Sequence, residues 1–265
     1  MVYRMYNALI EQFKLAQTLA SDAYRAVASA EMSAFPWLED YERATRSRHD
    51  YKAERELSKF CVDLSEVVVR VARRELTPPG TRIEIDRASE LEAAGIDIGE
   101  GLREGRTPDL DAFWSHLKRK FSGDAGAEIA YKQAAKGIID GLWLKPGTEL
   151  KRTSSGIVID VPTGSEASFS SAGWRRVSYY AQTRASALIS GLSTFATRAG
   201  YASLAAELQR SRIVSDEYRS RDKLPFSGLE IVLFNDKWQF KFSHAVGDSL
   251  SLFVSEFGAD YLASR

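Results

Sequence analysis

Residues 228–263, "GLEIVLFNDKWQFKFSHAVGDSLSLFVSEFGADYLA", predict two short strands, a tight turn and a helix. Trp238, Phe240 and Phe242 alternate with polar residues, so three rings share one face of the second strand. Val232 and Phe234 are expected to supply apolar residues on the first strand. The helix carries apolar residues at helical spacing: Val246, Leu250, Phe253, Val254 and Phe257. Because burial of each ring beneath that helix stabilises the fold by about 1.5–3 kcal/mol, we expect core here, not a base-stacking platform or a catalytic corner.

Upstream of this segment, the apolar pattern predicts a second hairpin and several helices. The hairpin is "ELKRTSSGIVIDVP" (149–162), with its turn at 154–156, and a loop rich in glycine and serine follows at 163–173. Helices are expected at residues 3–34, 50–75, 127–143 and 174–197 and within 200–222. A further helix is expected to start with Thr107 as the N-cap and Pro108 as the first helical residue. The expected core face of the first helix is Tyr6, Leu9, Ile10, Phe13, Ala16 and Ala20.

This order of elements predicts a predominantly α-helical α+β protein. The strands do not alternate one by one with helices, which argues against a doubly wound parallel sheet. Three regions are expected. Residues 1–79 are an N-terminal helical region, and residues 80–107 are an acidic surface excursion with a short strand at Ile83 and Ile85 and a short helix. Residues 108–265 are an α+β domain with two hairpins.

Composition limits the classes of function. The chain has 265 residues and one cysteine, so an intrachain disulfide framework is excluded, and no apolar run approaches the roughly 20 residues of a membrane span. Glu11 and Lys14 interrupt the apolar N-terminal pattern, which argues against a signal peptide. These features favour the cytoplasm and no membrane partner.

Charge is balanced overall but unevenly distributed. Lys+Arg and Asp+Glu both number 36, whereas proteins that grip phosphate backbones non-specifically usually carry a positive excess. Residues 81–111 carry nine acidic and four basic residues, and residues 150–223 carry eleven basic and six acidic ones. Both regions are compatible with ordinary solvated faces or with partner contacts.

Titratable residues form no pattern typical of catalysis. His49, His116 and His244 have no metal-ligand spacing, and we expect packing or capping roles for the last two. Cys61 lies within an apolar helical stripe, which favours a small core residue over a nucleophile. Neither glycine-rich stretch matches a phosphate-binding motif. The sequence therefore predicts a protein that is not an enzyme and uses no metal or cofactor.

A group of arginines and tyrosines is the first candidate partner-binding site. In "SSAGWRR" (170–176), a helix N-terminus beside Arg175 and Arg176 is expected to suit a phosphate. Tyr179, Tyr180 and Arg184 are expected on the same helix. Arginines interleaved with aromatic residues suit nucleic acid and protein interfaces alike, and they also occur on purely structural helices.

Two further charged groups are candidate partner-binding residues. Arg210 and Arg212 open a segment of mixed charge that is expected to be exposed and salt-bridged. The acidic excursion contributes Glu84, Asp86, Glu90 and Glu92.

The C-terminal pattern resembles a known family of bacterial and phage domains. It consists of "AAKGIIDGLWL" (134–144), "LKRTSSGIVIDV" (150–161), "RASALISGLSTFATRAG" (184–200) and "GLEIVLFNDKWQFKFSHAVGDSLSLFVSEFG" (228–258). Members of this uncharacterised family occur alone or joined to adenine-specific DNA methyltransferase-like domains, and the likeness covers about residues 110–262. Their hairpin turn is typically Asn-Gly-like, whereas this chain has Asn235, Asp236 and Lys237. The family implies no catalytic residues, and this chain has no methyltransferase motif.

The resemblance implies a setting among phage and plasmid genes concerned with DNA modification and host defence. The leading hypothesis is therefore a non-enzymatic, mobile-element protein that binds a host defence complex of the restriction or CRISPR type and inhibits or disassembles it. The alternative is an accessory nucleic-acid-binding module of a DNA-modification system, using Arg175, Arg176, Tyr179 and Arg184.

Overall fold

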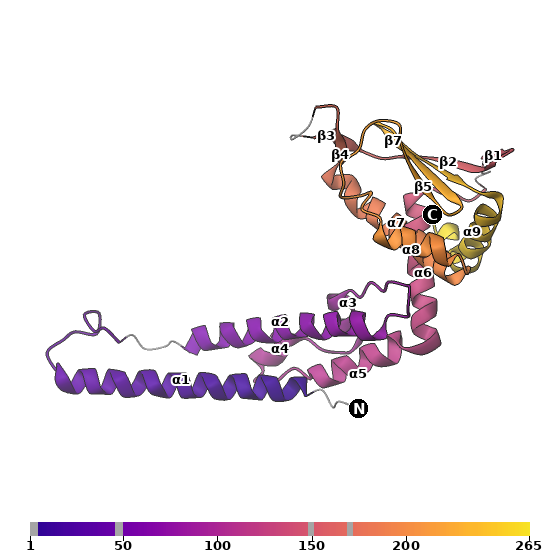
Figure 1. Cartoon of the computed structure of the whole chain (residues 1–265). Coiled ribbons are helices and arrows are strands. Elements are labelled where there is room, and N and C mark those ends of the chain that lie inside the picture. Colours follow the sequence, from indigo (N-terminus) through magenta and orange to yellow (C-terminus); the bar gives the residue numbers. More distant parts are fainter. Residues whose placement is uncertain (1–4, 46–49, 148–150, 169–171) are drawn as a thin grey trace. The chain divides into compact units, whose positions relative to one another are not determined.

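Helices dominate the structure, a computed structural model that describes the chain except for residues 1–4, 46–49, 148–150 and 169–171. In the described part, ten helices accompany seven strands, which form antiparallel sheets (Figure 1). The prediction of a mainly helical α+β protein is confirmed. No helix in this part is long and apolar enough to cross a membrane. Outside the described residues lie several predicted features: helix residues 3 and 4, His49, hairpin residues 149 and 150, and loop residues 169–171.

The chain divides into two compact units, and the division differs from the predicted one. Unit 1 is Met1–Glu75 with Ile85–Lys120, and unit 2 is Leu76–Glu84 with Phe121–Arg265. The predicted boundaries between the three regions fall after residue 79 and after residue 107. Composition changes at those points, but compact units follow packing, and most of the acidic excursion packs with the preceding helices.

Unit 1 is helical. Its elements are α1 (Tyr6–Ala34), α2 (Asp50–Leu76), α3 (Arg87–Ala93), α4 (Ile98–Arg103) and α5 (Leu110–Phe121). The first half of α1 packs against α2 and α5. The Phe13 and Phe60 rings stack with centroids 4.3 Å apart, and the Tyr6 N–H donates to Asp111 Oδ1 over 2.7 Å. The predicted core face of α1 is confirmed at Tyr6 and Ile10, but Leu9 is exposed.

Two predictions in unit 1 and the adjoining residues were wrong, and a third holds only in part. Ile83 and Ile85 form no strand, although both are buried, because each is held by packing outside a sheet. The acidic segment is a surface excursion only in part, because Ile83, Ile85, Leu91 and Ile98 are buried whereas most of its charged residues are exposed. Thr107 does not cap α5. Asp109 does so, its carboxylate accepting the Ala112 N–H over 2.8 Å.

Unit 2 combines helices with a five-stranded sheet. The helices are α6 (Gly123–Gly141), α7 (Tyr179–Arg198), α8 (Ala202–Arg210), α9 (His244–Phe257) and α10 (Ala259–Ala263). The strands are β1 (Lys151–Thr153), β2 (Gly156–Pro162), β5 (Asp222–Phe226), β6 (Leu229–Leu233) and β7 (Lys237–Phe242), in the spatial order β1-β2-β7-β6-β5. The strands β3 (Ser165–Ala167) and β4 (Arg175–Val177) form a separate pair. The two predicted hairpins thus belong to one sheet, because β2 pairs with β7.

The register of β7 explains why its aromatic residues form core. Phe240 lies opposite Ile159 on β2 and Ile231 on β6, and the same alignment repeats on either side at Phe242 and Trp238. The three rings are at most 1% exposed. Helix α9 contributes to the same core: Val246, Leu250, Phe253 and Val254. The predicted aromatic core covered by the terminal helix is confirmed.

The opposite face of the sheet is polar. Val232 is a buried apolar residue of β6, as predicted, but it pairs with Gln239 and so lies on the face opposite to the three rings. The run Leu229–Leu233 is almost continuously apolar, and alternation alone does not choose its inward residues. Asp160 accepts hydrogen bonds from Lys237 and Gln239 at 2.9 and 2.8 Å, as expected of a solvated face.

Other element boundaries in unit 2 also differ from the predictions. Residues 175–177 form β4 instead of helix, so α7 starts at Tyr179, and α8 ends at Arg210 instead of continuing to residue 222. The strand β5 was missed. It contains Pro225 and lies at the edge of the sheet, the place where a strand tolerates proline. Helix α6 starts four residues before the predicted position 127, at Gly123.

Candidate protein interface

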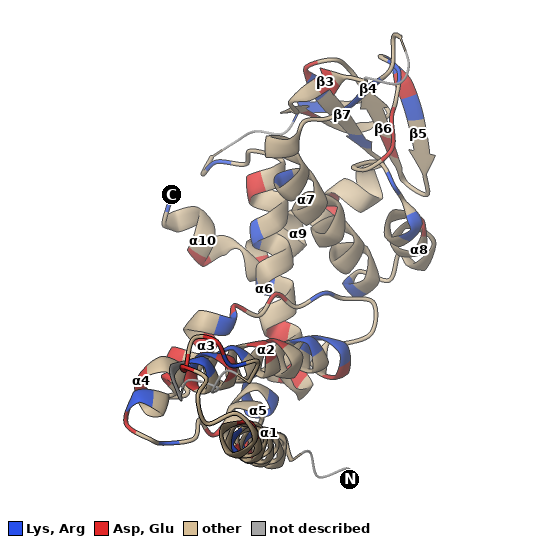
Figure 2. Ribbon diagram, turned by 90° about the vertical axis from the view of Figure 1, so that its left-hand side faces the viewer, with Lys and Arg blue, Asp and Glu red and all other residues tan. Residues whose placement is uncertain are grey.

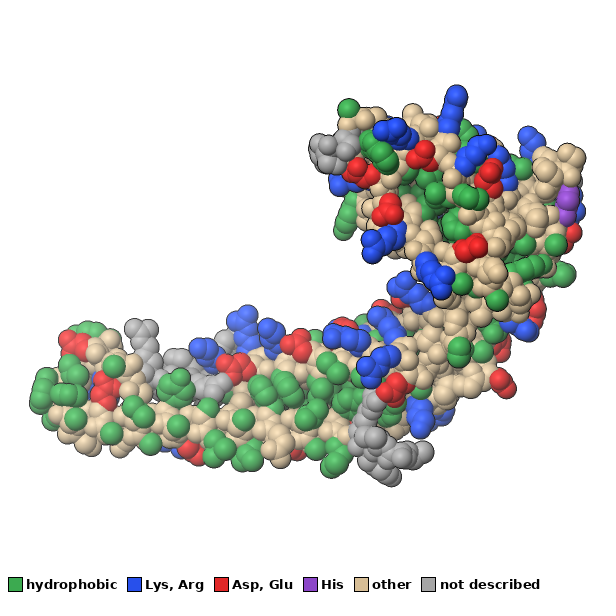
Figure 3. Space-filling model, viewed as in Figure 1, with side chains coloured by type: hydrophobic (Ala, Val, Ile, Leu, Met, Phe, Trp, Pro, Cys, Tyr) green, Lys and Arg blue, Asp and Glu red, His purple; other side chains and the backbone are tan. Residues whose placement is uncertain are grey.

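One segment carries most of the exposed apolar surface. Among the described residues, fifteen large hydrophobic side chains are exposed, and ten of them lie on α1 or next to it. These ten are Met5, Leu9, Leu15, Leu19, Tyr24, Val27, Met32, Phe35, Trp37 and Tyr41. We call α1 together with residues 35–45 the apolar arm. Figure 3 shows hydrophobic side chains along this helix and over the loop that follows it. Contiguous exposed apolar surface typically marks an interaction site.

The far half of α1 runs past its neighbour. Gln17 Nε2 donates to the Ala53 carbonyl over 2.9 Å, close to the start of α2, and Figure 1 shows α1 extending beyond that start. Six of the 17 residues at 18–34 are alanine, the best helix former, so local propensity supports the helix there. The segment thus forms a helix that exposes its apolar side chains.

Charge distinguishes the arm from the helix beside it. α1 carries five charged residues among 29, whereas α2 carries twelve among 27. Both signs of charge are mixed over both units (Figure 2). A helix exposed to water on most sides usually carries a charged face. The small number of charged residues on α1 favours contact with another apolar surface.

The loop after α1 adds aromatic side chains within an acidic setting. The Phe35 and Trp37 rings meet edge to face with centroids 5.7 Å apart, and Trp37 is 71% exposed. Tyr41 is 80% exposed. The neighbouring charged residues are Glu39, Asp40, Glu42 and Arg43, of which Arg43 pairs with Asp40 over 2.7 Å. Trp and Tyr dominate binding hot spots, so this loop suits a protein surface with basic edges.

Glu31 fixes the loop to the helix. Its carboxylate accepts the Ala44 and Thr45 N–H groups over 2.7 and 2.9 Å. Hydrogen bonding by the Thr45 side chain, and next by these N–H groups, holds the pKa of Glu31 below its ordinary value. The aromatic loop is therefore held in place by an ionised carboxylate.

Glu31→Gln is expected to loosen the loop without unfolding unit 1. The amides of Ala44 and Thr45 should exchange with deuterium faster at neutral pH, because a neutral amide is a weaker acceptor than a carboxylate. Since the folded pKa is lowered, the stabilisation is present above the ordinary glutamate pKa and disappears as the pH falls through the lowered value. Glu39→Gln is the control and should leave both rates unchanged. Equal exchange in Glu31→Gln and the native protein would contradict this role.

The predicted basic site is only partly assembled. Arg175 lies on β4 and donates to the Ser165 side chain and carbonyl over 2.7 and 2.9 Å, and Arg184 donates to the Pro162 carbonyl over 2.7 Å. Arg184 also stacks on the Trp143 ring at 4.8 Å. The prediction that Arg175 and Arg176 flank a helix N-terminus was wrong, because α7 begins only after β4.

The remaining basic and aromatic candidates are more accessible. Arg176 pairs with Glu166 over 2.8 Å, both about half exposed. Tyr179 and Tyr180 begin α7 and are 77% and 94% exposed. Arg210 and Arg212, at and just after the end of α8, are exposed as predicted.

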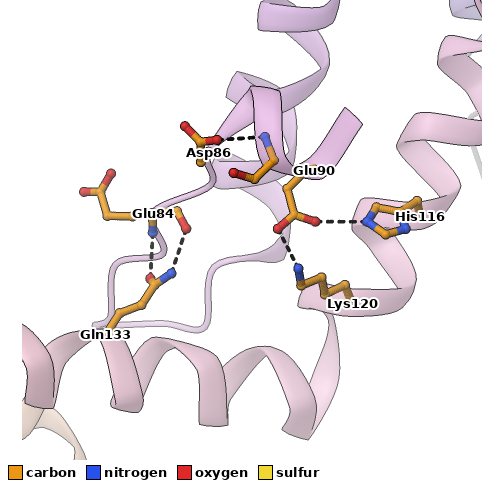
Figure 4. Close-up of polar contacts among 7 residues, drawn as sticks. Glu84, Asp86, Glu90, His116, Lys120 and Gln133 are labelled. Atoms are coloured by element: carbon orange, nitrogen blue, oxygen red, sulfur yellow. Dashed lines mark hydrogen bonds and ion pairs between the residues drawn. The ribbon is translucent and has the colours of Figure 1, made fainter. Parts of the chain in front are cut away.

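The acidic candidates have mainly structural roles. Glu90 is buried and accepts hydrogen bonds from His116 Nε2 at 2.9 Å and Lys120 Nζ at 2.6 Å (Figure 4). Asp86 caps α3, and hydrogen bonding by Ser89 lowers its pKa. Glu84 pairs with Arg82 over 2.9 Å, and its backbone bonds Gln133. Glu92 is exposed. As a group these residues do not form a free acidic surface.

Glu90→Ala is expected to destabilise unit 1 by about 2 kcal/mol, because two charge-assisted hydrogen bonds are lost from a buried position. Urea unfolding monitored by circular dichroism measures this change. The control is Glu92→Ala two residues away, expected to change the free energy of unfolding by less than about 0.5 kcal/mol. Equal stability of the two variants would show that the Glu90 contacts contribute nothing.

The other titratable residues match their predicted roles in part. Cys61 is buried, as predicted for a core residue, and burial raises the pKa of its thiol. His116 contacts Glu90, whereas His244 only begins α9, whose cap is Ser243. Within the described residues, no group of three or more His, Cys, Asp or Glu side chains is placed to hold a metal ion.

Sequence reasoning missed the apolar arm. It selected one apolar face of α1 and overlooked Leu15 and Leu19, which lie outside that face. It also overlooked Val27, which lies 18 residues after Leu9 and so continues the predicted face. The signal was present as a long helix with apolar residues outside the predicted face and few charges. Comparison with protein-family models, curated proteins and solved structures finds no significant match to this chain.

Proposed function

We propose that this protein acts by binding another protein through the apolar arm. The observation that carries the proposal is the gathering of nine of the fifteen exposed large hydrophobic side chains on α1 and its loop, with Met5 just before them, within the described residues. Each such side chain gains about 1.5–3 kcal/mol on full burial, so a partner that covers several gains substantial binding energy. Nucleic acid offers no comparable apolar surface for leucine and valine side chains.

The partner's chemistry follows from the loop. Exposed Trp37 and Tyr41 act as anchors, and Glu39, Asp40 and Glu42 around them favour a basic rim on the partner. Proteins that hold nucleic acid present such basic surfaces. We therefore propose the acidic residues of the loop after α1 as partner-binding residues, in place of the earlier candidates Glu84, Asp86, Glu90 and Glu92.

The family resemblance suggests what kind of assembly contains the partner protein. We place the protein in the cytoplasm as a non-enzymatic, mobile-element product that binds a host defence complex of the restriction or CRISPR type. Occupation of a basic surface or a subunit interface by the arm blocks or dismantles that complex. The second candidate, a nucleic-acid-binding module, is supported by a groove in unit 2 that is described below.

Affinity capture from host lysate tests this function. Tagged protein is incubated with lysate that carries the defence system, with and without nuclease, at about 50 and 200 mM salt. We expect stoichiometric subunits of one nucleic-acid-handling assembly to remain bound after nuclease treatment. Recovery of nucleic acid alone, lost steeply at the higher salt, would contradict protein binding and favour the second candidate.

A further inference from the structure

Unit 2 contains a polar groove along α7. A hollow of about 840 Å³ lies between α7, the end of α8 and residues 80–82, and a second of about 560 Å³ adjoins it and shares Arg82, Gln182, Ser186, Ser190 and Thr194. Three arginines line the first hollow: Arg82, Arg176 and Arg212. None of its lining residues is acidic. The second hollow is lined by Glu84 as well as Arg82, so the excess of positive charge lies in the first hollow.

Hydroxyl groups form a row on the α7 side of the groove. Thr183, Ser186, Ser190 and Thr194 follow one another at spacings of three and four, so they share one helical face. Thr194 is only 2% exposed and lines both hollows. A row of hydroxyl groups along the wall of a groove supplies donors and acceptors for a polar ligand.

The three arginines differ in their present partners. Arg212 is exposed and has no ion-pair partner in the described part of the chain. Arg82 pairs with Glu84 and Arg176 with Glu166, but all four side chains are 42–65% exposed. Exposed pairs contribute about 0–1 kcal/mol, so a phosphate replaces the carboxylates at little cost.

Two exposed aromatic side chains lie at the start of α7, three and two residues before Gln182, which lines both hollows. Tyr179 lies four residues before Thr183 and therefore continues the hydroxyl row, and it is 77% exposed. Tyr180 beside it is 94% exposed, and the two rings meet edge to face at 5.7 Å. Exposed aromatic rings at the end of an arginine-lined groove are the combination on which unpaired bases stack while phosphates follow the arginines.

We propose that this groove binds single-stranded nucleic acid, with Arg82, Arg176 and Arg212 on phosphates and Tyr179 stacked on a base. The span from Gln182 to Thr194 is about 18 Å along the helix, which suits a short extended segment. A duplex has no splayed bases for Tyr179. This site is separate from the apolar arm and does not depend on the proposed protein binding.

Fluorescence anisotropy with labelled twelve-nucleotide oligothymidylate and oligouridylate tests the proposal. Three phosphate contacts predict that the affinity falls about 20-fold between 50 and 200 mM salt. Arg212→Ala should reduce the salt slope by about 0.7, and Tyr179→Ala should weaken binding by about fivefold or more. Arg210→Ala is the matched control, because Arg210 does not line the first hollow, although it borders a neighbouring one together with Arg212. Its loss should leave both quantities unchanged.

Three results would overturn the proposal. They are no binding of either oligonucleotide at 50 mM salt, equal weakening by Arg210→Ala and Arg212→Ala, or displacement by polyglutamate at lower concentration than by polyuridylate. The last result would assign the groove to an acidic protein segment. A variant with a charged arm, Leu19→Asp with Val27→Asp, should keep full oligonucleotide affinity, so failure of the arm and failure of the groove are distinguishable.

Discussion

Leu19→Asp combined with Val27→Asp is expected to weaken capture of the protein partner by about 100-fold or more. Both side chains are more than half exposed, so the substitutions cost the free protein little beyond the modest helix propensity of aspartate. In the complex, two carboxylates would be buried against apolar surface, and each isolated charge costs several kcal/mol unless it is paired. Quantitative pull-down against a dilution series of the native protein measures the loss.

The matched control for this double variant is Leu252→Asp. Leu252 is 72% exposed on α9 in unit 2, which makes it as accessible as the arm residues but outside the arm. Capture should be retained in the control, and circular dichroism should show equal helix content in all three proteins. Undiminished capture by the double variant would show that α1 is not the binding surface.

Phe240→Ala is expected to lower the free energy of unfolding of unit 2 by about 3–5 kcal/mol. The ring is fully buried at the centre of the sheet, between Ile159 and Ile231 on the neighbouring strands. Removal leaves a cavity that this rigid arrangement closes only in part. Urea denaturation monitored by tryptophan fluorescence, to which buried Trp238 contributes as one of five tryptophans, measures the loss.

Gln239→Ala is the control on the same strand. Gln239 lies on the polar face and donates to Asp160 over 2.8 Å, so its loss should cost less than about 1 kcal/mol. Similar destabilisation by both substitutions would mean that the two faces of β7 are equally buried, contrary to the register.

The core of unit 2 was predictable because apolar and polar residues alternate strictly along β7, and only one face of such a strand can be buried. Trp238, Phe240 and Phe242 must therefore share the inner face, and the apolar residues of α9 pack in the same core. Leu229–Leu233 lacks alternation, so its inward residues depended on register, which the turn at 234–236 sets. The pairing of β2 with β7 joins segments about 80 residues apart and left no local signal.

The candidate sites were harder to predict, because exposure and partners are tertiary properties. Glu90 and Glu92 look alike in sequence, yet one is buried against His116 and the other is exposed. Arg175 donates a hydrogen bond to Ser165, whereas Arg212 lines the groove. The apolar residues of α1 are visible as a pattern, but only the position of α2 decides which of them stay uncovered.

Photo-crosslinking from the arm tests the central claim most directly. A benzophenone side chain placed at Trp37 or Tyr24 is irradiated in host lysate after nuclease treatment, and the products are identified by mass spectrometry. The account predicts crosslinks from both arm positions to the same protein subunit, and none to that subunit from Leu252 in unit 2. Crosslinks to that subunit from Leu252 but not from Trp37 or Tyr24 would contradict a protein interface on α1.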